Sequence, residues 1–133
     1  MTVAAHSLTS FTFPDETEID LIERRGEGTL KIYVSDLKKQ SGRCVTFHFA
    51  ISVRIADERD LMEYWPVCST PAGWLFRVLD GGWLAQELNR PGSISPKIDP
   101  DIKEYLITGI HDCVSVLSIE EPVLSEYHPY RRV

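Results

Sequence analysis

The chain has 133 residues, of which 43% are hydrophobic and 26% are charged, so it can bury a core as one domain over residues 1–133 and lacks the composition of a disordered segment. Its formal net charge of -6 disfavours nucleic acid or an anionic membrane as the main partner, because phosphate groups bind basic surfaces. A basic protein is the partner class that the charge fits, and plain solubility is the simpler explanation of the same charge.

The first forty residues predict antiparallel strands joined by short turns. We expect an edge strand over residues 7–13 and two further strands over residues 18–23 and 29–36, with the glycine-containing segment 24–28 as a hairpin loop. Pro14 would end the first strand, because proline has no N–H to donate to a neighbouring strand. In the third strand alternate residues should face the core, and these are Leu30, Ile32 and Val34.

Residues 43–55 carry the most regular pattern in the sequence. Every second position is apolar, namely Val45, Phe47, Phe49, Ile51, Val53 and Ile55. This period of two predicts one long strand inside an antiparallel sheet. His48 and Arg54 fall on its opposite face, where together they could bind an anion or hold a base near a carboxylate. The alternative is a half-exposed strand face without a ligand.

Asp57 begins a segment that is rich in carboxylates. It suits the N-cap of a short helix over residues 57–65, which Pro66 would end. Either this segment is a solvated helix start, or its acidic side chains form a face that attracts and selects a cationic partner. Trp65 and Trp83 are candidate anchors beside it, because tryptophan is enriched at binding hot spots, although core filling explains most tryptophans. The acidic side chains are Asp57, Glu58, Asp60 and Glu63.

The second half of the chain predicts short elements separated by turns. They are a strand at 74–79, a helix at 83–90, a loop at 93–100, strands at 105–110 and 113–119, and a flexible tail at 126–133. The alternative to the last two strands is one bent strand with a bulge. The whole pattern predicts an α+β fold, mainly an antiparallel sheet of about six strands, with two short helices packed on one face.

The titratable residues show no arrangement that predicts catalysis, a metal site or a cofactor. The four histidines lack metal-ligand spacing. The cysteines, Cys44, Cys68 and Cys113, are too scattered for a zinc ribbon or a disulfide framework, so we expect buried reduced thiols. His111, Asp112 and Cys113 are contiguous, but neighbours in a strand point to opposite faces and do not readily form a nucleophile–base pair.

Two features of the sequence indicate a compartment. Residues 1–14 contain no basic residue and no long apolar run, so they match neither a signal peptide nor a transit peptide. No stretch approaches the ~20 apolar residues that a membrane helix needs. Together with the reduced thiols, these features predict a cytoplasmic protein with no membrane partner.

Three segments of the second half resemble a known type of protein. They are the strand GWLF at 73–76, the turn DGGWL at 80–84 that leads into a helix, and the strand CVSVLS at 113–118 with Glu121 and Pro122 after it. In layout they resemble small bacterial immunity proteins, which neutralise polymorphic toxins such as those of contact-dependent inhibition systems. The resemblance implies a single cytosolic domain without enzymatic activity that occludes a basic toxin domain, often a nuclease.

The sequence therefore favours a non-enzymatic partner-binding protein. Its candidate ion-pairing residues are the four carboxylates between residues 57 and 63, and its candidate apolar anchors are Trp65 and Trp83. Two alternatives stay open. One is a homodimeric structural module that pairs through an edge strand such as 7–13. The other is a small-ligand-binding or enzymatic domain with its site near His48 and Arg54.

Overall fold

The computed structural model describes residues 2–9, 13, 16–69 and 72–129 of the chain. Within this part, nine strands form two antiparallel sheets, and two short α-helices and two 3-10 turns lie in the connections. The predicted α+β class with mainly antiparallel strands is confirmed, although the described residues form nine strands rather than about six. No helix in these residues has the length and the apolar character that crossing a membrane would require.

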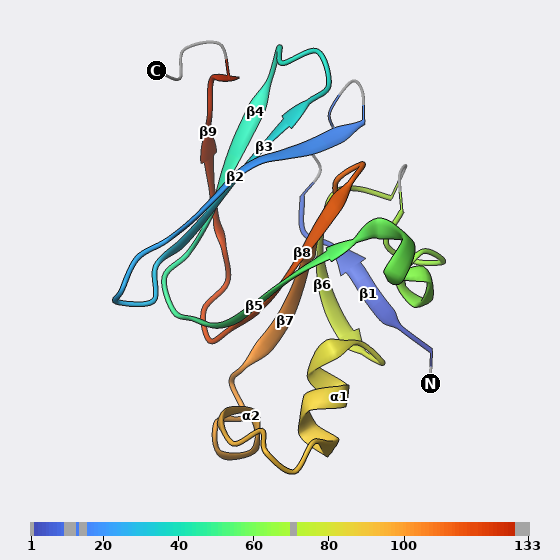
Figure 1. Cartoon of the computed structure of the whole chain (residues 1–133), viewed down its shortest axis with the longest axis vertical. Helices are drawn as coiled ribbons and strands as arrows, with labels where there is room; N and C mark the ends of the chain where they lie inside the picture. The colour runs from blue at the N-terminus through green and yellow to red at the C-terminus, as the bar shows by residue number, and fades with distance from the viewer. Residues whose placement is uncertain (1, 10–12, 14–15, 70–71, 130–133) are drawn as a thin grey trace.

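The two sheets form two layers (Figure 1). The five-stranded sheet contains, in spatial order, β1 (Ala4–Ser7), β6 (Leu75–Asp80), β7 (Lys103–Ile107), β8 (Asp112–Ser118) and β5 (Ala50–Asp57). The four-stranded sheet contains, in spatial order, β2 (Thr17–Arg24), β3 (Leu30–Asp36), β4 (Gly42–Phe47) and β9 (Val123–Glu126). Consecutive strands are not always neighbours, so each sheet is built from segments that are distant in the chain.

The main core lies between the two sheets. The four-stranded sheet contributes five fully buried side chains, which are Leu30, Ile32, Val34, Val45 and Phe47. The five-stranded sheet contributes Leu75, Tyr105, Ile107, Val114 and Val116. Burial of each large apolar side chain stabilises the fold by roughly 1.5–3 kcal/mol, so this layer is the main source of stability. The prediction that alternate residues of β3 face the core is confirmed.

The other face of the five-stranded sheet is covered as well. A second cluster of buried side chains joins this face to the segment after β5, and it includes Leu61, Tyr64, Cys68, Phe76, Leu106 and Cys113. Both faces of β7 and β8 are therefore buried, and their side chains are mostly apolar or small, with Glu104 as the one carboxylate buried in them. The same packing holds the segment after β5 in a fixed place beside the sheet.

The prediction of one long strand over residues 43–55 is wrong. The chain leaves the four-stranded sheet after Phe47, turns at His48 and Phe49, and enters the five-stranded sheet at Ala50. Phe47 and Ala50 are buried, whereas the side chain of Phe49 is 52% exposed. Since Phe49 has the same phase in the pattern as Phe47, a period of two in the sequence does not reveal a crossing between two sheets.

The helix predicted over residues 57–65 is instead two 3-10 turns, η1 (Glu58–Asp60) and η2 (Met62–Tyr64). Between them Leu61 has φ -124° and ψ 34°, outside the α-helical region. Its side chain is buried in the second cluster, so packing on the sheet overrides the helical pattern. Asp57 is the predicted N-cap, and its side chain accepts the N–H of Arg59 at 2.9 Å.

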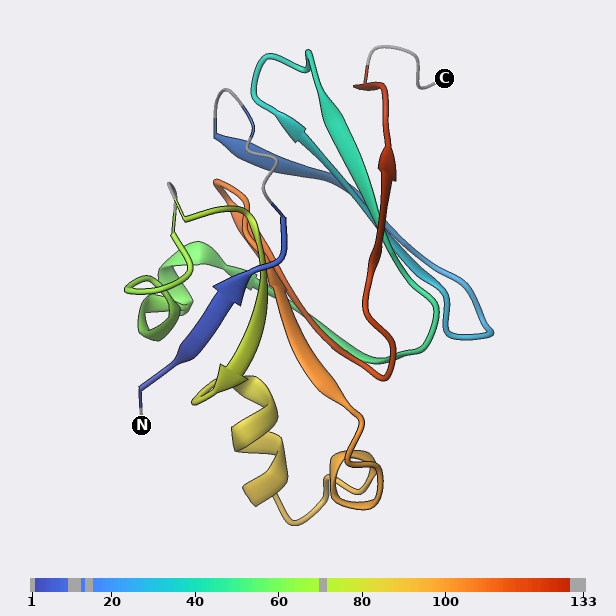
Figure 2. The same cartoon turned by 180° about the vertical axis from the view of Figure 1, so that it is seen from behind.

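The two α-helices lie in the connection between β6 and β7, at one end of the five-stranded sheet (Figure 1 and Figure 2). The first, α1 (Trp83–Asn89), confirms the helix predicted at 83–90. The second, α2 (Ser95–Ile98), forms where the sequence predicts a loop. Both carry large apolar side chains that remain exposed, among them Leu88 and Ile98.

At the two ends of the chain, the described residues cover only part of the segments predicted from the sequence. The described edge strand is β1, whereas residues 10–12 of the strand predicted at 7–13 lie outside the described residues. In the tail predicted from residue 126, Glu126 ends β9 and Tyr127 is buried, with its hydroxyl donating to Asp20 at 3.0 Å. Residues 130–133 lie outside the described part.

Candidate functional site

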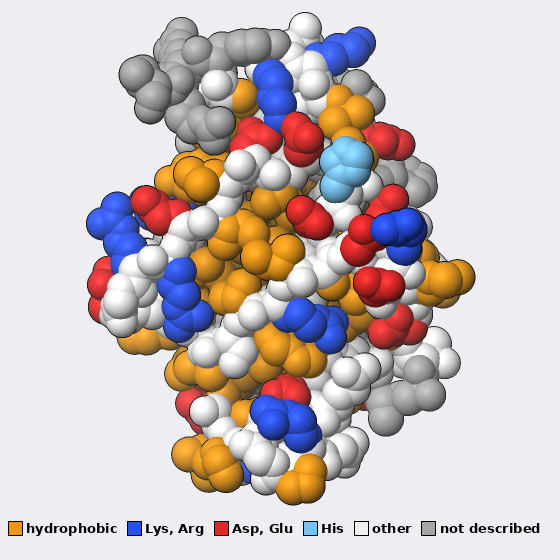
Figure 3. Space-filling model, in the orientation of Figure 1, with side chains coloured by type: hydrophobic (Ala, Val, Ile, Leu, Met, Phe, Trp, Pro, Cys, Tyr) orange, Lys and Arg blue, Asp and Glu red, His pale blue; other side chains and the backbone are white. Residues whose placement is uncertain are grey.

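One group of acidic side chains surrounds the end of β5. It consists of six carboxylates, which we call the acidic surface: Glu16, Asp57, Glu58, Asp60, Glu63 and Asp112. Three parts of the chain bring them together, because Asp57 pairs with Asp112 between β5 and β8, and Glu16 and Glu58 line one cleft. Acidic side chains gather over the segment that follows β5, at the right of Figure 3.

The acidic surface holds most of the excess negative charge of the chain. Its six carboxylates and Arg59 together carry a formal charge of -5, against -6 for the whole chain, so the remaining residues carry -1. Arg59 forms a salt bridge with Asp57 at 3.1 Å, and hydrogen bonds from Arg59 lower the pKa of Asp57. The carboxylates of Glu58, Asp60 and Glu63 are exposed and form no hydrogen bond or salt bridge with another described residue.

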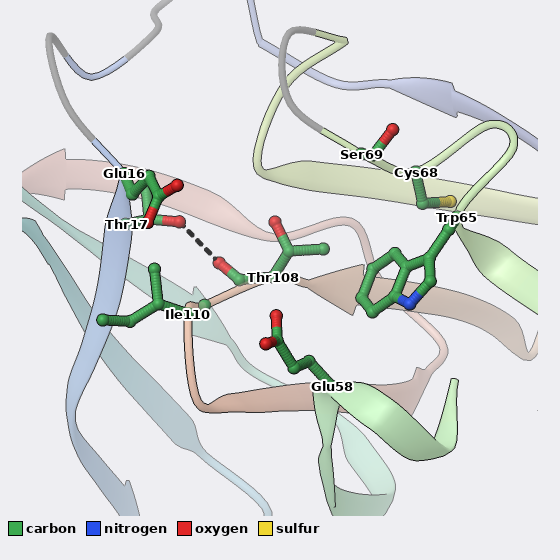
Figure 4. Close-up of a pocket in the computed structure, with 9 residues that line it drawn as sticks. Glu16, Thr17, Glu58, Trp65, Cys68, Ser69, Thr108 and Ile110 are labelled. Atoms are coloured by element: carbon green, nitrogen blue, oxygen red, sulfur yellow. Dashed lines mark hydrogen bonds between the residues drawn. The ribbon is translucent and has the colours of Figure 1, made fainter. Parts of the chain in front are cut away.

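An open cleft with a volume of about 350 Å3 lies within this surface. It is lined by the start of β2, the segment after β5 and the turn between β7 and β8, with the residues Glu16, Thr17, Glu58, Trp65, Cys68, Ser69, Thr108, Gly109 and Ile110. Figure 4 shows Thr17 and Ile110 on one side, Trp65 on the other, and the carboxylate of Glu58 between Ile110 and Trp65. The cleft therefore combines an aromatic wall with negative charge.

Hydrogen bonds fix the frame of the cleft. The hydroxyl of Thr17 donates to the carbonyl of Thr108 at 2.8 Å, and the N–H of Ile110 donates to the carbonyl of Thr17 at 2.9 Å. The N–H of Glu58 donates to the carbonyl of His111 at 3.1 Å. These bonds join β2 and the segment after β5 to the same turn between β7 and β8, so both walls of the cleft have a common support.

Cys68, which lines the cleft, and Cys113, which lies in the same buried cluster, are poor nucleophiles. Cys68 and Cys113 are both buried. Burial, with Glu104 as a further cause, raises the pKa of Cys68 to about 12, and burial raises the pKa of Cys113 to about 11. Both thiols are therefore protonated at neutral pH, whereas the thiolate is the reactive form. Cys44 is also buried and free, so the expectation of buried reduced thiols is confirmed.

Trp83 does not line the cleft and belongs to a network that anchors α1. The guanidinium carbon of Arg54 lies 5.0 Å from the centre of the Trp83 ring. Glu104, which is 1% exposed, accepts hydrogen bonds from the hydroxyl of Tyr64 at 2.7 Å and from the N–H of Leu84 at 2.8 Å. The hydroxyl of Tyr64 in turn accepts the N–H of Trp83 at 2.9 Å. This network ties the first turn of α1 to the sheet.

His48 and Arg54 do not share one strand face. His48 lies in the exposed turn between β4 and β5, whereas Arg54 lies in β5 and contacts Trp83. Their predicted proximity depended on an unbroken strand over residues 43–55. Because the chain changes sheet at His48, the two side chains do not form the single ligand face that the sequence suggested.

Five of the six predicted partner-binding residues fall into three places, and the sixth, Trp83, belongs to the network at α1. Glu58 and Trp65 line the cleft, Asp57 and Asp60 flank it at η1, and Glu63 lines a second hollow of about 300 Å3 beside α1. Sequence reasoning missed the cleft residues that lie outside the acidic segment, since no local spacing connects them. They are Glu16, Thr17, Cys68, Ser69, Thr108, Gly109 and Ile110.

Among the described residues, no group of three or more His, Cys, Asp or Glu side chains is arranged to hold a metal ion. No protein-family model matches the chain, and searches of the curated proteins and of the solved structures gave no match.

Proposed function

We propose that this chain is a non-enzymatic binding protein that covers a basic protein partner with its acidic surface, as an immunity-type inhibitor covers a toxin domain. One observation carries the proposal: of the six net negative charges of the chain, four lie around the end of β5, and a fifth, that of Glu63, lies beside α1 after the same segment. Charges spread over the whole surface would serve solubility equally well. A local excess of one sign instead favours a partner of the opposite sign.

Such a surface acts on association in two ways. It raises the rate of encounter with a cationic partner, and it disfavours partners of the same sign. A toxin domain that acts on nucleic acid needs a basic cleft to hold phosphate groups. Carboxylates placed over that cleft would exclude the substrate. The inhibitor would act in the cytoplasm as one copy per toxin, and it would need no cofactor.

A pull-down with matched charge variants tests this proposal. The tagged chain is used as bait in a lysate of the source cell, and the retained proteins are released by raising the salt concentration, which screens exposed charges. The four-site variant removes the charges predicted to bind: Asp57→Asn, Glu58→Gln, Asp60→Asn and Glu63→Gln. The control variant removes four exposed charges elsewhere: Glu27→Gln, Asp101→Asn, Glu120→Gln and Glu121→Gln.

The control charges lie toward the opposite end of the β5–β8 pair. The end of β5 that carries the acidic surface pairs Asp57 with Asp112, whereas the other end pairs Ala50 with Ser118. We expect the wild-type and control chains to retain one basic protein near one-to-one and the four-site variant to lose it. Retention of that protein by the four-site variant would contradict the proposal. A chain that retains no partner and changes mass with its own concentration would favour the homodimeric module.

A further inference from the structure

The cleft beside Trp65 differs from the rest of the acidic surface. It is concave, it has an aromatic wall, and it opens between the carboxylates of Glu16 and Glu58. Ligand pockets usually have volumes of roughly 300–1,000 Å3, and this cleft lies at the lower end of that range. It is therefore suited to a single side chain or a similarly small group rather than to a large ligand.

We propose that this cleft receives one arginine side chain of the basic partner, an inference that rests on the binding function proposed above. The guanidinium group is planar, so it can stack on the indole of Trp65 while its N–H groups donate to the carboxylate of Glu58. That carboxylate has no hydrogen bond or salt bridge to another described residue, which leaves its oxygens available as acceptors. Glu16 adds a second negative charge to the lining.

Arginine fits this cleft better than lysine does. An ammonium group is a compact and strongly hydrated charge, so moving it next to an indole ring and Ile110 removes favourable hydration. A guanidinium group is more weakly hydrated, and its flat face matches the flat face of Trp65. Cys68 contributes a protonated thiol at neutral pH, so it neither repels nor pairs with the cation.

The cleft is formed before any ligand binds. One wall is held by the hydrogen bonds of Thr17 with Thr108 and Ile110, and the backbone of Glu58 is held by the carbonyl of His111. On the other wall, Trp65 packs against the second cluster of buried side chains. A site with a fixed frame loses less conformational entropy when the ligand enters. The arginine side chain would therefore act as an anchor, with the exposed carboxylates of the acidic surface around it.

An NMR titration of the full chain tests the site directly. The probe is the blocked tripeptide acetyl-Gly-Arg-Gly-amide, and the indole N–H signals of the three tryptophans are followed, with Trp65→Phe used to assign Trp65. We expect the Trp65 signal to shift and saturate while the Trp83 signal stays in place. The matching lysine tripeptide should bind at least about threefold more weakly. The matching citrulline tripeptide, which has no charge, should not saturate the site.

Two single variants separate the cleft from general charge attraction. Glu58→Gln removes a charge that lines the cleft and should weaken binding of the arginine tripeptide about tenfold. Asp60→Asn removes the same charge from a neighbouring residue outside the cleft and should change the affinity by less than about twofold. Equal losses in the two variants would overturn the inference. An unmoved Trp65 signal, or equally tight binding of the lysine tripeptide, would overturn it too.

The captured basic protein distinguishes a failed arginine site from a failed acidic surface. If Glu58→Gln and Asp60→Asn weaken its binding equally while the four-site variant loses it, the acidic surface stands and the arginine site is wrong. If the four-site variant still retains it, the proposed function is wrong whatever the tripeptides do. Loss of that protein from the Glu58→Gln chain and its retention by the Asp60→Asn chain would support both.

Discussion

Two groups of carboxylates in this molecule have opposite environments. Two carboxylates on β2, those of Glu18 and Asp20, form salt bridges with the ammonium group of Lys39. The distance from Lys39 Nζ to the Asp20 carboxylate is 2.6 Å. Asp20 also accepts the hydroxyls of Ser35 at 2.7 Å and Tyr127 at 3.0 Å, and its side chain is 7% exposed. The acidic surface at the end of β5 has six carboxylates, most of which are exposed, and Arg59 forms a salt bridge with one of them, Asp57.

This difference indicates which carboxylates serve the fold. Asp20 joins β2 to β3, to the turn after it and to the residue that follows β9, so it links several segments of the four-stranded sheet. Burial alone would lower the pKa of Lys39, but its hydrogen bonds to Asp20 and Glu18 outweigh burial and raise that pKa. The acidic surface makes few such contacts. Neutralising its carboxylates should therefore change the free energy of unfolding little and weaken partner binding strongly.

Glu104 is a fully buried carboxylate. Its replacement should cause the largest loss of stability among the carboxylate variants. Glu104→Ala leaves the hydroxyl of Tyr64 and the N–H of Leu84 without their acceptor. We expect the free energy of unfolding to fall by about 3 kcal/mol, measured by urea denaturation. Glu104→Gln, which keeps one acceptor oxygen, should lose less. An alanine variant as stable as the wild type would show that this network does not anchor α1.

Asp20 and Asp60 give the sharpest test of the comparison itself. Asp20→Ala removes the acceptor of Lys39, Ser35 and Tyr127, and we expect it to lower the free energy of unfolding by about 2 kcal/mol. Asp60→Ala changes an exposed side chain and should stay within about 0.5 kcal/mol of the wild type. Equal losses in the two variants would remove the distinction between carboxylates of the fold and carboxylates of the surface.

Cys68 gives a smaller effect that depends on pH. Its pKa is raised from 9.0 to about 12, so the thiol ionises at lower pH in the unfolded chain than in the folded one. Between these values the unfolded chain binds fewer protons, and the free energy of unfolding therefore falls as the pH rises. Between about pH 8 and about pH 10, Cys68→Ala should reduce this fall by about 1 kcal/mol in urea denaturation. If the free energy of unfolding fell equally with pH in the wild type and in Cys68→Ala, the Cys68 thiol would be solvated and its pKa would not be raised by burial.

The sequence predicted strands well where one face meets the core, as in the alternation of Leu30, Ile32 and Val34 on β3. It failed at residues 43–55 because an alternating pattern carries no information about a change of sheet. A bulge in β5 after Ala50 then shifts the register by a further residue. β9 was also missed, because its four residues are all exposed and lack a core-facing pattern.

The acidic surface was easier to predict than the cleft within it. Four of its carboxylates lie between residues 57 and 63, so they are visible as a cluster in the sequence. The cleft combines residues 16–17, 58–69 and 108–110, which the hydrogen bonds of Thr17 and of Glu58 with the β7–β8 turn bring together. Contacts over such separations depend on tertiary packing, which local spacing does not encode.

Charge attraction at the acidic surface is tested most directly by the dissociation constant of the captured partner at two salt concentrations. The wild-type chain and the four-site variant are compared by calorimetry at about 50 mM and about 200 mM salt. We expect the wild-type affinity to fall steeply with salt, and the four-site variant to bind at least about a hundredfold more weakly at the lower salt. Equal affinities for the two chains, unchanged by salt, would contradict a binding function of the acidic surface.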